Sequence, residues 1–188
     1  MIKEVRCAFI GTCPLIMRSA RLANPLDPLA RALHDISTRR KKSEADIREM
    51  GRIEWYGALY LRDGRPCVPS DAIEATFFNA AKANRRKIAA KSAFYVNDSP
   101  YLQYDGPQDI DRMWEDDTFH FLKTVAVQGK RVLRMRPIFH KWRIDATCLY
   151  EDGILSEDEV WKHLEYAGKY VGLLEWRPRY GRFTVGRL

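Results

Sequence analysis

The stretch that decides the fold class runs from Thr118 to Tyr150 and reads TFHFLKTVAVQGKRVLRMRPIFHKWRIDATCLY. It divides into three predicted strands, Thr118 to Gln128, Arg131 to Phe139 and Trp142 to Tyr150. Apolar and polar residues alternate in the first and third of these, which is typical of strands that bury one face. The inward set of the third strand is Trp142, Ile144, Ala146, Cys148 and Tyr150. The turn at Gln128-Gly129-Lys130 joins antiparallel neighbours, so the stretch predicts a meander.

Strands and helices on both sides of this meander complete the pattern. Glu4 to Cys13 alternates like a half-buried strand. After the meander, Ser156 with Glu159 forms a capping box that opens a helix, and Gly168 is a candidate for its end. Gly172 to Val185 is a last strand-like segment. The order predicts an α+β fold with an antiparallel sheet, either ferredoxin-like or a modified RRM core, carrying helical insertions.

A single domain of residues 1–188 is expected, with a helical insertion at about 24–57 and a loop insertion at about 92–117. In the helical insertion, Asp27 is positioned to cap one helix, and Ser43 with Asp46 opens a second, short one. The basic run Arg39 to Lys42 lies between the two helices and is expected to be exposed.

Between the insertions, the sequence predicts a hairpin followed by a helix. Asp63-Gly64 is a strong turn signal, so the hairpin should turn there. A long helix is expected to start behind a cap at Ser70 or Asp71 and to run to about Lys91.

Composition excludes several classes of protein. Hydrophobic residues make up 46% of the 188 and charged residues 30%, so the chain can build a core. No apolar run reaches the about 18 residues of a membrane span, and the start, MIKEVRCAFIG, has no signal-peptide pattern, so a cytoplasmic location is expected. The four cysteines show no CxxC spacing, and no P-loop or GxGxxG is present. We therefore expect no metal, nucleotide or other cofactor.

The net charge of +7 says less than its distribution. One basic segment lies on the meander and another ends the chain, and aromatic residues interleave with the second. Arginines give bidentate phosphate contacts and flat rings give stacking surfaces, so both segments predict a nucleic-acid interface. The predicted binding residues are Arg134, Arg136, Lys141, Arg143, Trp176, Arg177, Arg179, Tyr180 and Arg182. The alternative interpretation is a solvated strand face that keeps the sheet soluble.

The sequence also offers candidates for catalytic residues. None of the four histidines has metal-ligand spacing, and His140 beside Lys141 is the one candidate for a general base acting on RNA. Asp27 and Glu54 are candidate acids in predicted loops, with a helix cap or a solvated carboxylate as the alternative role for each.

Three segments together resemble the RAMP superfamily, the proteins of CRISPR effector complexes, and specifically its backbone subunits. Phe9-Ile10-Gly11-Thr12-Cys13-Pro14-Leu15-Ile16-Met17 is similar to the family's first strand and following turn. Gly64-Arg65-Pro66-Cys67-Val68-Pro69-Ser70-Asp71-Ala72-Ile73-Glu74-Ala75 looks like its glycine- and proline-rich turn into a helix. Gly172 to Val185 resembles its terminal glycine- and arginine-rich strand.

The resemblance implies a modified RRM core, single-stranded RNA in a basic groove and head-to-tail assembly along the strand. The function we expect is therefore non-catalytic RNA binding, with RNA, further copies of the chain or other effector subunits as partners and no membrane. Two alternatives stay open: a metal-independent endoribonuclease using a histidine such as His140, and a subunit mimic that inhibits a CRISPR-type complex. A stand-alone relative encoded by a phage or mobile element fits the same resemblance. Some RAMP proteins cut RNA with an acidic loop residue, for which Glu54 is the candidate.

Overall fold

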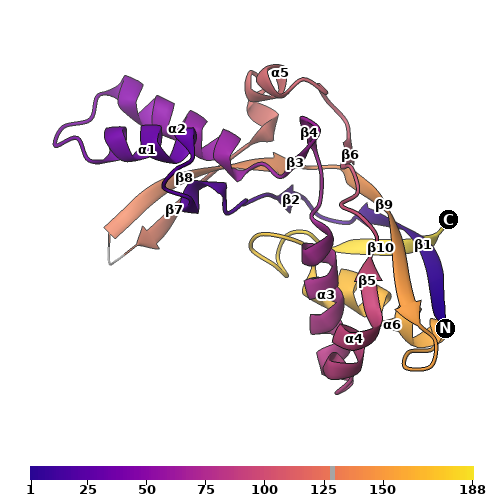
Figure 1. The fold of residues 1–188 in the computed structure, drawn as a ribbon. Coiled ribbons are helices and arrows are strands. Elements are labelled where there is room, and N and C mark those ends of the chain that lie inside the picture. The colour runs from indigo at the N-terminus through magenta and orange to yellow at the C-terminus, as the bar shows by residue number, and fades with distance from the viewer. Residues whose placement is uncertain (128–129) are drawn as a thin grey trace. The chain divides into compact units, whose positions relative to one another are not determined.

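The computed structural model describes residues 1–127 and 130–188, which form two compact units (Figure 1). Unit 1 comprises Met1–Leu15, Leu61–Gly106 and Phe139–Leu188, and unit 2 comprises Ile16–Tyr60 and Pro107–Ile138. The predicted helical insertion lies wholly in unit 2. Antiparallel sheets and helices occur in the same chain, so the predicted α+β class is confirmed. In the part of the chain that is described, no helix has both the length and the apolarity to cross a membrane.

Unit 1 is built on an antiparallel sheet in which β1 occupies a central position. Its strands are β1 (Ile2–Gly11), β5 (Phe94–Val96), β9 (Trp142–Glu151) and β10 (Phe183–Arg187), in the order β10-β1-β9-β5. The short β6 (Gln103–Tyr104) also pairs with β9. Cys7 lies opposite Ala146 and Phe9 lies opposite Ile144, so the alternating apolar residues of β1 and β9 share one face.

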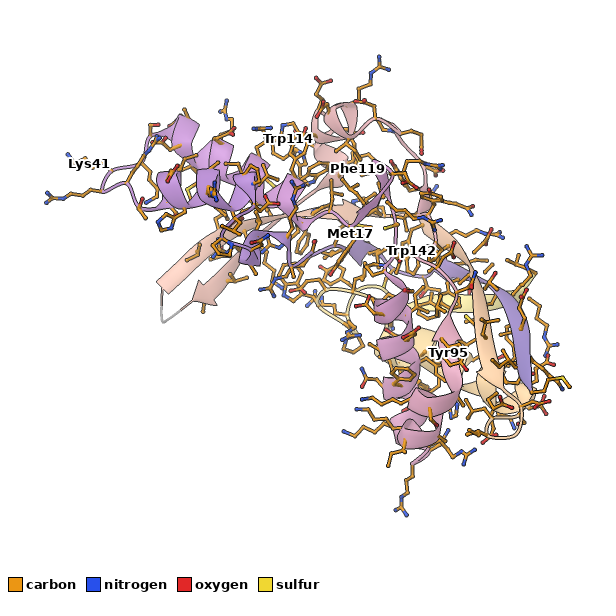
Figure 2. The ribbon with its side chains drawn as sticks, viewed as in Figure 1. Met17, Lys41, Tyr95, Trp114, Phe119 and Trp142 are labelled. Carbon is orange, nitrogen blue, oxygen red and sulfur yellow. The ribbon has the colours of Figure 1, made fainter. Side chains whose placement is uncertain are left out.

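That shared face is the core of unit 1. All five predicted inward residues of β9 are buried, which confirms the alternation. Phe9 stacks on Phe183 with ring centroids 4.6 Å apart, and Phe77 stacks on Phe94 at 3.7 Å. Trp142 donates its indole N–H to the Cys13 carbonyl at 2.8 Å, so a buried ring is also satisfied at its polar atom (Figure 2).

Helices α3 (Ser70–Ala83), α4 (Lys87–Ala93) and α6 (Glu157–Tyr166) complete unit 1. The single long helix expected up to Lys91 is wrong, because Arg85 has φ 58 and separates α3 from α4. The predicted side-chain cap of α3 is also wrong: Pro69 occupies the N-cap position, and the Ser70 N–H donates to Ser99 Oγ at 3.1 Å. The capping box of Ser156 and Glu159 is confirmed.

The prediction that the helix ends at Gly168 is wrong. The chain continues from α6 through a π-helical turn, η3 (Ala167–Val171), to Gly172. Gly168 instead allows close packing, since a Cβ there would lie 2.2 Å from the Phe183 carbonyl oxygen. Hairpin β3 (Leu61–Arg62) and β4 (Arg65–Pro66) turns at Asp63-Gly64 as predicted. Both turn residues have positive φ, 50 and 73, which a type I′ turn requires.

Unit 2 packs helices against a hairpin. Its helices are η1 (Arg21–Ala23), α1 (Pro28–Ser37), α2 (Glu44–Ala58), α5 (Ile110–Trp114) and η2 (Asp117–Phe119). The predicted caps at Asp27 and Ser43 are confirmed, although α2 has 15 residues and is not short. Lys41 extends from the exposed loop between α1 and α2 (Figure 2).

The hairpin consists of β7 (His120–Val127) and β8 (Lys130–Phe139), and β2 (Leu15–Ile16) lies on the other side of β8. The predicted meander of three strands in one sheet is therefore wrong. β9 pairs with β1 along one edge and with β5 and β6 along the other, so it has no free edge for β8. The predicted turn at residues 128–129 lies outside the described residues.

Candidate nucleic-acid interface

The segment Gly172 to Arg182 is a loop, and only Phe183–Arg187 forms the last strand, so the prediction of a continuous strand here is wrong. Leu174 and Trp176 have φ of 58 and 52, and Gly172 and Gly181 have φ of 78 and 71. Left-handed backbone at this many positions cannot pair in a ladder, and such strain in a non-glycine residue persists only where surrounding contacts hold it.

Hydrogen bonds from several parts of unit 1 fix this loop. The Leu173 N–H donates to the Gly181 carbonyl, and the Gly181 N–H donates to the Pro14 carbonyl, both at 2.8 Å. Thr76 on α3 donates its hydroxyl to the Gly172 carbonyl at 3.1 Å. A Cβ at Gly181 would lie 2.0 Å from the Leu173 carbonyl oxygen, so only glycine fits this position. The loop is therefore a preorganised support for the side chains it carries.

Five of the predicted binding residues lie together on this loop: Trp176, Arg177, Arg179, Tyr180 and Arg182. The three arginines are exposed, and the two rings are half-buried. Arg177 donates to the Thr76 hydroxyl at 3.3 Å. Across residues 1–127 and 130–188, the side chains of Arg179 and Arg182 make no ion pair and no hydrogen bond. Their guanidinium groups are thus available to an external anion.

Arg143 lies on β9 of unit 1, and Lys141 immediately precedes that strand. Arg143 donates to Asp145 Oδ1 at 2.8 Å, and the Lys141 ammonium lies 3.7 Å from Asp105 Oδ2. Burial raises the pKa of Asp145, but hydrogen bonds from Arg143 and Gln103 outweigh it and leave that pKa lowered. The charge of Arg143 is therefore partly compensated within the protein. Lys141 is 85% exposed at its side chain, so its ion pair is a weak constraint.

Arg134 and Arg136 lie in unit 2, on β8, and both face Glu54 of α2. Arg134 Nη1 pairs with Glu54 Oε1, Arg136 Nη1 lies 3.8 Å from Oε2, and the Met135 N–H donates to Oε2 at 3.0 Å. The two arginines are two residues apart on the strand, so their side chains lie on one face and share this partner. The structure gives both arginines an internal carboxylate, whereas the loop arginines of unit 1 have none among the described residues.

The interpretation of Glu54 as a loop acid is wrong, because it lies within α2 and is only 3% exposed. Its surroundings are two cations and a backbone donor, which hold a carboxylate in place structurally. Asp27 caps α1 by accepting from the Leu29 N–H at 2.8 Å. Neither acid is positioned for acid–base chemistry on a ligand.

The histidines differ widely in environment. His140 is exposed and makes no hydrogen bond or ion pair with any described residue. His120 lies in an aromatic cluster of unit 2 that includes Trp114 at 4.3 Å, with its Nδ1 3.2 Å from Asp117 Oδ1. The Trp55 ring of this cluster donates its indole N–H to the carbonyl of Phe119 at 2.9 Å; Trp114 and Phe119 are labelled in Figure 2. His163 is 2% exposed and faces the Phe77 ring at 5.4 Å.

The cysteines are free thiols, and three of the four are buried. Cys7 and Cys148 lie on adjacent strands with their sulfurs 3.8 Å apart. A hydrogen bond between this thiol and Cys7, together with burial, holds the pKa of Cys148 well above the usual range. Among the described residues no group of three or more His, Cys, Asp or Glu side chains is arranged to hold a metal ion.

Two features of unit 1 escaped prediction. Tyr101 has the guanidinium groups of Arg62 and Arg65 at 5.0 and 4.5 Å from its ring, and it donates its hydroxyl to Asp63. A pocket beside β10 brings Arg182 together with side chains of α6 and η3. No signal in the sequence joins residues so far apart in the chain, although the helical spacing of Glu165 and Lys169 places them on one face.

A scan of protein-family models finds none that matches this chain, and a search of curated proteins finds no match either.

Proposed function

We propose that this protein binds single-stranded nucleic acid, RNA rather than DNA, through the loop Gly172–Arg182. The observation that carries the proposal is a rigid loop presenting arginines without internal acidic partners beside half-buried rings. Guanidinium groups suit phosphate oxygens, and the faces of Trp176 and Tyr180 suit stacked bases. Lys141 and Arg143 would extend the same contacts along unit 1. Arg134 and Arg136 enter the proposal only if a polyanion competes with Glu54.

The strand order supports a ferredoxin-like or modified RRM core as part of this proposal. Read along the chain, unit 1 runs β1, α3, β5, β9, α6, β10, and the last strand lies beside the first. That is a βαββαβ arrangement. The relationship to RAMP backbone subunits, and assembly of several copies along one strand, are proposed from the sequence motifs together with this order. A growing number of copies per RNA as the RNA is lengthened would support such assembly.

Binding of a fluorescein-labelled single-stranded RNA, followed by anisotropy, tests the proposal. Arg177→Ala with Arg179→Ala should weaken binding at least about ten-fold, because each lost charged hydrogen bond contributes about 1.5 kcal/mol or more. The matched control is Lys82→Ala with Lys91→Ala, which removes two exposed cations of unit 1 elsewhere. Equal loss in both double variants would mean that only net charge matters, and no binding by the wild type would refute the proposal.

The endoribonuclease alternative rests on the exposure of His140 beside Lys141. Incubating a hairpin RNA with the protein in EDTA distinguishes it from simple binding. Cleavage that disappears in His140→Ala would favour the nuclease, and intact RNA would discard it. The subunit-mimic alternative would be favoured if partner proteins copurify after nuclease treatment.

A further inference from the structure

A cavity of about 440 Å³ lies beside the edge strand β10 in unit 1. It is bounded by the end of β1, by α6, by η3 and by β10. The lining residues are Thr12, Glu165, Lys169, Arg182, Phe183, Thr184 and Val185. This volume falls within the about 300–1,000 Å³ typical of small-ligand sites. Arg182 belongs to both this pocket and the proposed binding loop, so the two are continuous.

The floor of the pocket is fixed by the core. Phe183 is 3% exposed and stacks on Phe9, with the two rings inclined by only 15°. Gly168 lets η3 approach the Phe183 backbone closely. Thr12, Thr184 and the charged lining residues are exposed. Phe183 therefore fixes the pocket from below, and the half-buried Val185 supplies the apolar floor beside the polar rim. This arrangement suits a ligand that has both an apolar part and a polar part.

The charged groups of the rim have no ionic or hydrogen-bonding partner among the described residues. Glu165 and Lys169 are four residues apart on a helical turn, a spacing that commonly allows an ion pair. Within residues 1–127 and 130–188, however, neither of them nor the Arg182 side chain forms an ion pair or hydrogen bond. The Lys169 ammonium lies 5.2 Å from the centroid of the Tyr170 ring. Two cations and one carboxylate are therefore available to a ligand at the same place.

This mixed charge indicates which ligand fits. Lysine and arginine bind a phosphate, but a carboxylate at the same rim repels a bare phosphate ion. A carboxylate accepts hydrogen bonds, and the ribose hydroxyls of a nucleotide are donors. The 2′-hydroxyl is also the group by which a protein distinguishes RNA from DNA. Phosphate, ribose and base together match the two cations, the carboxylate and the apolar floor.

We propose that this pocket holds one ribonucleotide of the bound strand and that Glu165 selects ribose over deoxyribose by accepting a hydrogen bond from the 2′-hydroxyl. This inference rests on the proposed function and adds its sugar specificity. Lys169 and Arg182 contact the adjoining phosphate. The base lies against the half-buried Val185, and Thr12 and Thr184 supply further hydrogen bonds.

Anisotropy titrations with labelled oligo(U) and oligo(dU) of equal length test this, since the two differ only at the 2′ position. The wild type should favour the RNA, and Glu165→Ala should reduce that preference by about five-fold or more, because a hydrogen bond to a charged group is lost only with RNA. Affinity for the DNA should stay the same or rise. Asp158→Ala, the same charge change on the same helix, is the control and should leave the ratio unchanged.

The outcomes separate the two proposals. If both strands bind but their ratio is the same in the wild type and in Glu165→Ala, ribose selection is wrong and the binding loop stands. If neither strand binds, both proposals fall. A titration with uridine 5′-monophosphate and its deoxy analogue, followed by amide chemical shifts, addresses the pocket directly. Shifts at Lys169 and Thr184 that are larger for the ribonucleotide are expected, and their absence while oligonucleotides bind would overturn the pocket assignment.

Discussion

The carboxylate of Glu54 on α2, 4% exposed at its side chain, is paired with the guanidinium of Arg134 on β8. The two residues are 80 positions apart and join the helical and hairpin parts of unit 2. A nearly buried carboxylate needs such a partner, because removal from water without one is costly. The pair therefore explains an arginine in the basic segment without any ligand.

Glu54→Gln should destabilise the protein by about 2–3 kcal/mol, somewhat less than the about 3–5 kcal/mol for a fully buried pair, because Arg134 can still contact water. Urea denaturation measures the loss. Glu49→Gln is the control on the same helix, since its pair with Arg52 is about two-fifths exposed on both sides, and it should cost about 0–1 kcal/mol. Equal costs for the two variants would mean that the Glu54 pair has no special structural role.

A second prediction concerns the loop Gly172–Arg182. Gly181→Ala should destabilise unit 1 and weaken nucleic-acid binding together, because the new methyl group would meet the Leu173 carbonyl and the backbone there is left-handed. The matched control is Gly186→Ala on β10, where a Cβ meets nothing within 4 Å. Thermal unfolding and RNA titration should show a large effect for the first variant and almost none for the second. Unchanged binding by a folded Gly181→Ala protein would show that loop geometry is irrelevant.

Features that depend on residues close together in the chain could be predicted from the sequence, whereas features that depend on distant residues could not. The alternation in β9 and the capping boxes at Ser43 and Ser156 are local patterns, and the structure has them where the sequence predicts them. Leu174 and Trp176 have left-handed backbone although neither is a glycine, so the sequence around them predicts a strand and gives no sign of the loop. The short connection between β8 and β9 predicts that they pair, but the inward residues of β9 lie opposite those of β1.

The residues of the candidate site also differ in whether the sequence reveals that they lie together. Clustering of arginines and aromatics between Trp176 and Arg182 is visible in the sequence because the residues are adjacent in the chain. The partner of Arg134 is not visible, since nothing near Glu54 in the sequence signals a contact with β8. Glu165 and Lys169 line the same pocket as Arg182 because η3 packs against β10, and the sequence does not show this packing.

A third prediction concerns pH. Burial lowers the pKa of His163, the positive charge of Arg86 lowers it further, and Glu159 opposes both. As the pH is lowered, the unfolded chain therefore takes up a proton at about pH 6.5, whereas the folded protein takes it up only at a lower pH. The free energy of unfolding falls as the pH drops below about 6.5. In His163→Leu this contribution is absent. The free energy of unfolding should fall more between pH 7.5 and 5 in the wild type than in the variant, and parallel pH profiles would contradict the assignment.

The last prediction is the salt dependence of binding, which separates phosphate contacts from all other effects. Each phosphate neutralised on a single strand releases counterions and adds about 0.7 to the magnitude of the slope of log K against log salt. Arg177→Ala with Arg179→Ala should therefore reduce that magnitude by about 1.4, whatever the sequence of the strand. Lys82→Ala with Lys91→Ala changes the net charge equally but should preserve the slope, because those cations lie away from the loop. Titrations between 50 and 200 mM salt, a range of about four-fold that suits such slopes, measure both. A slope that is unchanged in the loop variant, despite weaker binding, would mean that the loop acts through stacking or folding and that the phosphates are held elsewhere.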